Sequence, residues 1–165
     1  MSLLNGFDYN FRFTLPDGRV IEDRFENLMP QESVDYWADL FLANRVAITA
    51  WYMGLFEGNY VPTMNSKASD IPGVIGEMTA YESAGRPQCL GTYDGVSLLS
   101  NESAMAEFVL TADKTFYGAF IVSSATKADG GGVLASIGRF ASPRTLPAGT
   151  NFTCWASIPL VPTDF

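Results

Sequence analysis

The sequence predicts a mainly β protein, an antiparallel β-sandwich or jelly roll with one N-terminal helix and an N-terminal β-hairpin. Short segments in which apolar residues alternate with polar ones, or run together, follow one another along the chain and are separated by turns rich in Gly and Pro. Only one stretch has apolar residues at helical spacing. The chain has 165 residues, of which 47% are apolar and 17% charged, so we expect a single domain, 1–165, with a large core.

The first segment alternates regularly and predicts one strand of a hairpin within residues 1–26. One face of this strand carries four aromatic rings: Phe7, Tyr9, Phe11 and Phe13. Pro16-Asp17-Gly18 is typical of a turn, after which 19–25 can return as the second strand. A peripheral hairpin cannot leave these rings in water. We expect them to form an interface with another copy or a partner; the alternative is that the hairpin folds back onto its own sheets.

Residues 30–44 are predicted to form the helix. Pro30 suits a first helical turn, and Glu32 and Asp35 follow near the positive end of the helix dipole. Four apolar residues at helical spacing are expected to face the core: Val34, Trp37, Ala38 and Phe41.

Residues 46–160 are predicted to form the β body. Segment 46–56 is apolar on both alternating faces, which is typical of a strand in the middle of a sheet. A long loop rich in Gly and Pro is expected over 57–76. The remaining strands are predicted at 77–81, 105–111, 115–123, 133–140 and 151–160, with a glycine hairpin turn at 128–132.

Histidine, which many catalytic and metal sites use, is absent, and we predict no catalytic site, no metal site and no cofactor. The chain has no histidine, which excludes Ser-His-Asp and Cys-His arrangements and imidazole metal ligands. A carboxylate pair of the kind found in glycosidases is the remaining option, and the candidates are Glu77 with Glu82, or Glu102 with Glu107. Acids that face solvent explain these residues better. Lys127 to Gly132 has the wrong order for a phosphate-binding loop and is interpreted as a hairpin turn.

The two cysteines, Cys89 and Cys154, lie far apart in the sequence and have no metal-ligand spacing. The first residues lack the basic and long apolar regions of a signal peptide, so the protein is expected to stay in the cytoplasm in which it is made or to leave inside a larger assembly. In that compartment two free thiols are the expected state, with a disulfide as the alternative.

The charge distribution limits the classes of partner that the protein can bind. The formal net charge is −8, and the 10 Lys and Arg residues are scattered with no basic run. Direct nucleic-acid binding requires clustered cations, and an anionic membrane repels an acidic protein, so we expect neither partner. No apolar run reaches the roughly 20 residues that span a bilayer.

Several segments, taken in order, resemble a family of small structural proteins of tailed bacteriophages, variously described as capsid decoration, cement or tail-associated components. They are TAWYMGLFEGNY from Thr49, EMTAYESAGRPQCL from Glu77, TFYGAFIVSSAT from Thr115, and the stretch from Gly130 to Leu160. The resemblance spans roughly 27–160 and leaves the hairpin unmatched. It implies a virion component with a mostly β body and no catalytic residues, whose partners are the major capsid protein or other virion proteins.

Three functions remain open at this point. A capsid decoration or cement protein, acting as a homo-oligomer or bound to the head shell, is the first. A neck, tail or fibre-attachment protein is the second. An enzyme or a carbohydrate-binding module is the third, because a sugar platform and a protein interface both use Trp and Tyr.

Overall fold

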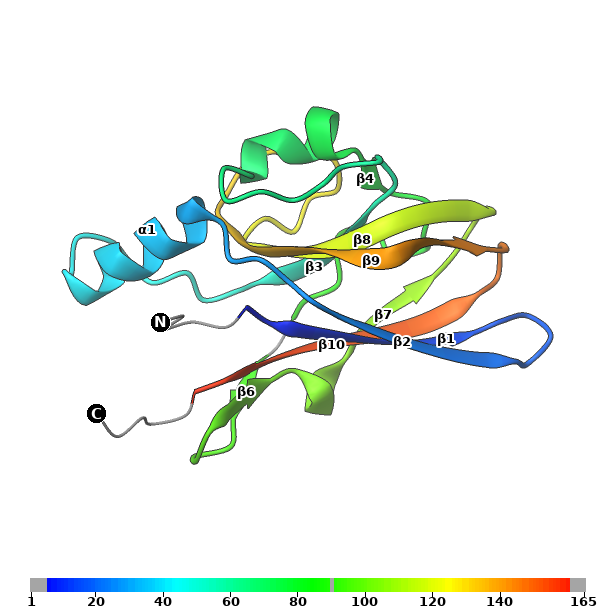
Figure 1. The fold of residues 1–165 in the computed structure, drawn as a ribbon, viewed down its shortest axis with the longest axis horizontal. Coiled ribbons are helices and arrows are strands. Elements are labelled where there is room, and N and C mark those ends of the chain that lie inside the picture. The colour runs from blue at the N-terminus through cyan, green and yellow to red at the C-terminus, as the bar shows by residue number, and fades with distance from the viewer. Residues whose placement is uncertain (1–5, 90, 161–165) are drawn as a thin grey trace.

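The structure, a computed structural model, describes residues 6–89 and 91–160 (Figure 1). It confirms a mainly β protein built of antiparallel sheets. The first sheet has the order β2-β1-β10-β6-β5, with β7 also paired to β10, and the second has the order β4-β3-β8-β9. The strands of the first sheet are β1 (Asp8–Thr14), β2 (Val20–Glu26), β5 (Thr92–Tyr93), β6 (Leu98–Ser100), β7 (Ala106–Val109) and β10 (Asn151–Pro159). Those of the second are β3 (Tyr52–Phe56), β4 (Glu77–Met78), β8 (Lys114–Val122) and β9 (Leu134–Leu146).

The predicted N-terminal hairpin exists, but it is not a peripheral arm. β1 pairs with β2 on one side and with β10 on the other, from Asp8 opposite Ser157 to Thr14 opposite Asn151. β1 is therefore an interior strand of the first sheet. The hairpin folds back onto its own chain, which was the alternative to the expected interface.

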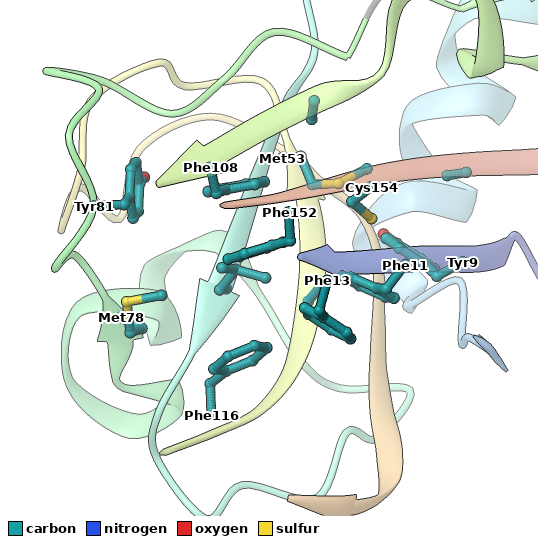
Figure 2. Packing of buried hydrophobic residues seen from close by; sticks show 14 of the residues in the cluster. Tyr9, Phe11, Phe13, Met53, Met78, Tyr81, Phe108, Phe116, Phe152 and Cys154 are labelled. Carbon is teal, nitrogen blue, oxygen red and sulfur yellow. The ribbon is translucent and has the colours of Figure 1, made fainter. Parts of the chain in front are cut away.

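The main core lies between the two sheets and is rich in aromatic rings (Figure 2). Phe11 from the first sheet packs 4.9 Å from Phe140 of the second, measured between ring centroids. Phe152 stacks on Phe108 at 4.9 Å and on Phe116 at 5.8 Å. Aromatic pairs at these separations add to the stability that comes from burying their area.

A second, smaller core covers the other face of the β3-β8-β9 sheet. It contains Phe56, Phe120 and Ile137 from the sheet, together with Ile71 and Ile75 from the short helical turns at Ala68–Asp70 and Ile71–Ile75. β8 is therefore buried on both faces, as its run of apolar residues predicts. The loop predicted for 57–76 contains these turns.

The helix α1 (Gln31–Phe41) is the third element of the chain, after the hairpin, so the prediction of an N-terminal helix is corrected. Its orientation is also the reverse of the prediction. Ser33 and Tyr36 face the protein, whereas Val34, Trp37 and Phe41 are exposed. Hydrogen bonds explain this orientation, because the Glu32 carboxylate accepts the backbone N–H groups of Ala68 at 2.9 Å and Leu134 at 2.8 Å.

Several predicted strands have different bounds, and the strand predicted over 77–81 is reduced to β4, Glu77–Met78. The strand predicted over 46–56 begins only at Tyr52, and Val46 is 88% exposed, so the expectation of an interior strand is wrong for 46–51. β9 continues past residue 140 to Leu146. Its register against β8 shifts within this stretch, and Pro143 lies where the shift occurs. Gly118 pairs with Arg139 whereas Phe116 pairs with Arg144, so the proline lies in the irregular stretch of an edge strand.

Candidate functional site

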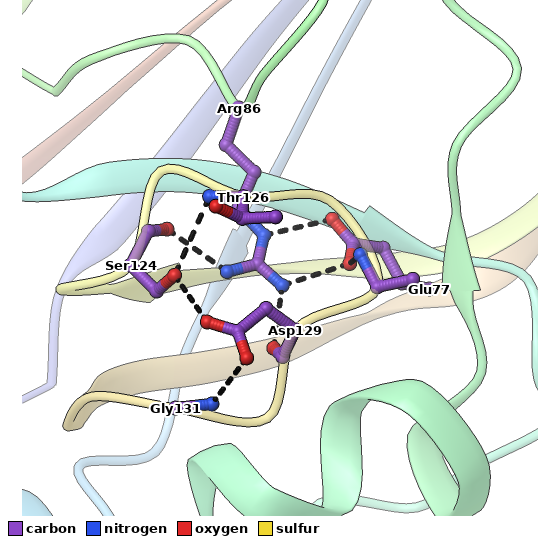
Figure 3. Close-up of polar contacts among 7 residues, drawn as sticks. Glu77, Arg86, Ser124, Thr126, Asp129 and Gly131 are labelled. Atoms are coloured by element: carbon purple, nitrogen blue, oxygen red, sulfur yellow. Dashed lines mark hydrogen bonds and ion pairs between the residues drawn. The ribbon is translucent and has the colours of Figure 1, made fainter.

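Glu77, the first carboxylate considered for catalysis, belongs to a buried ion pair (Figure 3). It accepts two hydrogen bonds from Arg86, Nε to Oε1 and Nη2 to Oε2, each 2.8 Å long. The remaining guanidinium donors bind the backbone carbonyls of Ser124 and Asp129, and Glu77 also accepts the N–H of Ala128 at 2.6 Å. All these groups are engaged within the chain. The arrangement joins β4 and the 81–88 loop to the 123–132 loop, and leaves Glu77 no opening toward a substrate.

The interpretation of the four acids as facing solvent is wrong for the buried Glu77 and agrees with the structure for the other three. Glu82, Glu102 and Glu107 are exposed at the surface. The structure therefore does not bring Glu77 and Glu82 together as two groups lining one cleft. Within the described residues, no cluster of three or more Cys, Asp or Glu side chains is placed to hold a metal ion.

The 123–132 loop connects β8 to β9 as a hairpin. Lys127 donates to the carbonyls of Tyr81 at 2.8 Å and Thr79 at 3.1 Å, and its ammonium lies 3.6 Å from the centre of the Tyr81 ring. Asp129 accepts the Ser124 hydroxyl at 2.6 Å and the Gly131 N–H at 3.0 Å, and these bonds lower the pKa of its carboxyl. The lysine and the acid both secure the loop, which agrees with the hairpin interpretation.

Both cysteines are free, as expected. Cys154 is buried in the main core and Cys89 packs against it. Burial raises the pKa of the Cys89 thiol to about 12 and that of Cys154 well above its usual range. A thiol with a raised pKa is a poor nucleophile near neutral pH, so neither cysteine is a candidate for covalent chemistry.

The four aromatic residues expected at an interface lie mostly inside the protein. Tyr9, Phe11 and Phe13 are fully buried in the main core, and Phe7 packs against it while partly exposed. The Tyr9 hydroxyl and the Ser136 hydroxyl are 2.6 Å apart, so the ring's polar end is satisfied within the chain. These rings are not a free surface, and the interface prediction is corrected for Tyr9, Phe11 and Phe13. The second sheet covers them with aromatic side chains of its own, Phe116 and Phe140.

Exposed apolar side chains gather instead on α1 and the residues that follow it. We refer to the following set as the α1 surface: Val34, Trp37, Phe41, Leu42 and Val46. Phe41 is 89% exposed, Leu42 69% and Trp37 37%. Large exposed apolar side chains that share a helix face, as Val34, Trp37 and Phe41 do by their spacing, are typical of interaction sites in soluble proteins. Helical spacing in the sequence identified Val34, Trp37 and Phe41 as one stripe, but it could not show that the stripe faces outward.

A small apolar cavity of about 100 Å³ opens beside the α1 surface. Its walls come from distant parts of the chain and include Phe7, Trp37, Trp51, Leu99 and Ile121. Trp37 belongs to both the cavity and the α1 surface, and Tyr36 packs edge-on against both Trp37 and Trp51 at 5.5 Å. Together, the cavity and the α1 surface are the candidate functional site. They suit the burial of apolar groups from a partner.

Within the described residues, no helix has both the length and the apolar character that crossing a bilayer requires. Comparisons with protein-family models, with curated proteins and with solved structures found no match for this chain.

Proposed function

We propose that this protein is a non-enzymatic structural component of a tailed-phage virion, and that it serves as a capsid decoration or cement protein that binds and stabilises the head shell. The resemblance over 27–160 supplies the virion context. The observation that carries a binding role is the α1 surface, where three large apolar side chains are each more than two-thirds exposed: Phe41, Leu42 and Val46. The proposal includes the finer fold prediction, a β-sandwich whose two sheets face each other across the aromatic core.

The energetics of the α1 surface suit attachment to a repeating lattice. Complete burial of a large apolar side chain contributes on the order of 2 kcal/mol. Part of that gain is lost to the ordering of both partners, so one such contact binds modestly. On a shell the same contact repeats by symmetry, and an oligomer that engages several positions gains through effective concentration.

The test is quantitative mass spectrometry of purified virions from the phage that encodes this chain. A decoration protein is expected at a copy number on the order of hundreds, because each shell subunit offers an equivalent position. About a dozen copies would instead identify a neck or tail component, where the symmetry is that of one portal or tail axis. Absence from washed virions would overturn the proposal.

A matched pair of variants tests the surface itself. Phe41→Ser is expected to reduce the occupancy of shells while leaving the free energy of unfolding nearly unchanged, because Phe41 is 89% exposed. Val74→Ser is the control, because Val74 is 66% exposed on a short turn outside the α1 surface. Equal occupancy for both variants would show that α1 does not contact the shell.

A further inference from the structure

β2 forms an open edge of the first sheet. Among the described residues, it pairs with β1 on one side and with no strand on the other. Past Glu26 the chain crosses to the second sheet on its way to α1 (Figure 1), and there Leu28 exchanges backbone hydrogen bonds with Ile137 of β9, at 2.9 and 3.1 Å. β9 therefore pairs with this side of the chain only beyond the end of β2, and it leaves the edge of Val20–Glu26 without a partner strand.

The register with β1 decides which backbone groups of β2 point toward the open side. Asn27 donates to the Phe7 carbonyl at 3.1 Å, and Leu15 donates to the Arg19 carbonyl at 2.9 Å. Because bonded pairs alternate with non-bonded pairs along an antiparallel ladder, the odd-numbered residues of β2 bond to β1. The even-numbered residues point their N–H and C=O groups away from it: Val20, Glu22, Arg24 and Glu26. Such a row of groups is a template for another strand.

Among the described residues, one hydrogen bond reaches the backbone of this row. The Arg24 N–H donates to the Asp23 carboxylate at 2.8 Å, a local bond that the carbonyl of a partner strand can replace. The other oxygen of that carboxylate accepts Arg144 Nε at 2.6 Å. Charges on an edge strand usually oppose pairing with another strand. Here the guanidinium of Arg144 neutralises Asp23, so this carboxylate repels an approaching strand less.

The charges of β2 suit an antiparallel copy of the same strand. Its even-numbered side chains lie on the outer face of the sheet, because the odd-numbered ones share the inner face with the buried rings of β1. When two β2 strands pair about a twofold axis at Asp23, Glu22 of each copy lies opposite Arg24 of the other. A shift of two residues either way puts Glu22 opposite Glu22, or Arg24 opposite Arg24. Opposite charges across a ladder are stabilising and like charges destabilising, so the charges select one register.

The same register adds to contacts that the sheet already makes. Glu22 accepts a hydrogen bond from Arg12 Nε at 3.0 Å, so Arg24 of the partner would continue a row of alternating charges. On the inner face, Ile21 is 37% exposed and would lie opposite the partner's Phe25, which packs against the main core. The dimer would thus bury apolar area as well as pair backbone groups.

We propose that β2 is a dimerisation edge, along which two copies of this chain pair antiparallel over Val20–Glu26 about a twofold axis at Asp23. The pairing joins the first sheets of the two copies into one. The inference goes beyond the proposed function, because it concerns contact between copies rather than contact with a shell. The formal charge of −8 on each copy opposes association at long range. At physiological ionic strength the Debye length of about 8 Å screens that repulsion, whereas the opposed side chains are in contact.

Sedimentation velocity of the full-length protein, over a range of concentrations at about 0.15 M salt, tests the interface. Arg24→Glu and Glu22→Arg each put like charges opposite one another, and each is expected to weaken the dimer at least about tenfold. An equal mixture of the two variants has opposite charges at both positions, so a heterodimer is expected to form. Lys67→Glu is the control, because it changes the net charge as Arg24→Glu does, at an exposed residue before the Ala68–Asp70 turn.

Amide hydrogen exchange, followed by NMR on the wild-type protein, tests strand pairing without any substitution. The amides of Glu22 and Arg24 are expected to exchange more slowly as the protein concentration rises, whereas those of Asp23 and Phe25, which bond to β1, should not change. The proposal is overturned if these four amides respond alike, or if the wild type stays monomeric into the millimolar range. It is also overturned if the mixed variants stay monomeric, or if Lys67→Glu weakens the dimer as much as Arg24→Glu. A dimer that Phe41→Ser disrupts and Arg24→Glu does not would place the contact at the α1 surface and would equally overturn it.

Discussion

Glu77 and Arg86 form a bidentate ion pair that solvent does not reach. The two hydrogen bonds are each 2.8 Å long, and the exposed fraction is 1% for the Glu77 side chain and 0% for that of Arg86. The remaining guanidinium donors bind carbonyls of the loop that joins β8 to β9. Removing a charge from water is costly, so this pair is stable only while both partners and their hydrogen bonds are present.

Arg86→Met is therefore expected to lower the free energy of unfolding by about 3–5 kcal/mol, because it leaves the Glu77 carboxylate buried without a countercharge. The double variant Glu77→Leu/Arg86→Met should lose less than the single variant. Urea denaturation measures both. Arg12→Ala is the control, because the Arg12–Glu22 pair is more than half exposed and exposed pairs contribute at most about 1 kcal/mol. If Arg86→Met and Arg12→Ala lowered the free energy of unfolding equally, the Glu77–Arg86 pair would not be the buried, stability-determining pair described above.

The hairpin is predicted to be essential for folding. Phe13 packs 5.2 Å from Phe152 and 6.1 Å from Phe116, so Phe13→Ala should cost about 3–5 kcal/mol through the cavity that it leaves. Deletion of residues 1–26 removes β1 from the middle of a sheet and should leave the chain unfolded, as measured by near-UV circular dichroism. Val20→Ala, at a site 56% exposed on β2, should change stability by less than about 0.5 kcal/mol. If the truncated protein folded, the hairpin would not be part of the core, and the prediction that it forms an interface with a partner would stand again.

Gly118 on β8 is predicted to tolerate no side chain. A Cβ atom there would meet the Gly138 carbonyl oxygen and the Phe56 ring well inside van der Waals contact. The carbonyl belongs to the paired strand and cannot move without breaking the ladder. Gly118→Ala should therefore lower the melting temperature, with a cost of about 1–3 kcal/mol or more. Gly73→Ala is the matched control, because its Cβ meets nothing within 4 Å. Equal melting temperatures for the two variants would refute the prediction.

Asp129 should make stability depend on pH in the acid range. The Ser124 hydroxyl and the Gly131 N–H lower its pKa below the ordinary value of 3.8 in the folded protein. The stabilisation is thus complete above about pH 3.8 and is lost as the pH falls through the folded pKa. Denaturation curves at several pH values should show wild type more stable than Asp129→Asn near neutrality, with the difference shrinking in acid. A difference that stays constant with pH would contradict this.

The periodicity of apolar residues in the sequence could not locate the candidate site, and α1 shows why. Helical spacing correctly grouped Val34, Trp37 and Phe41 on one face, but spacing says only which residues share a face. The face that α1 turns inward is set by hydrogen bonds from Ala68 and Leu134 to Glu32, residues far away in the sequence. The same holds for 46–50, whose apolar pattern predicts a strand but cannot supply the neighbour with which a strand must pair.

Local sequence patterns were sufficient to predict the mainly β class, the turn at 16–18, the alternation of β1, and the burial of β8 on both faces. These follow from side-chain period and turn chemistry, which are local properties of the chain. The packing of the sheets and loops was needed to show that Tyr9, Phe11 and Phe13 pack inward, that Glu77 pairs with Arg86, and that the stripe of α1 faces water. Each of these depends on contacts between segments distant in sequence. A local pattern contains no information about which distant segment will pack against it.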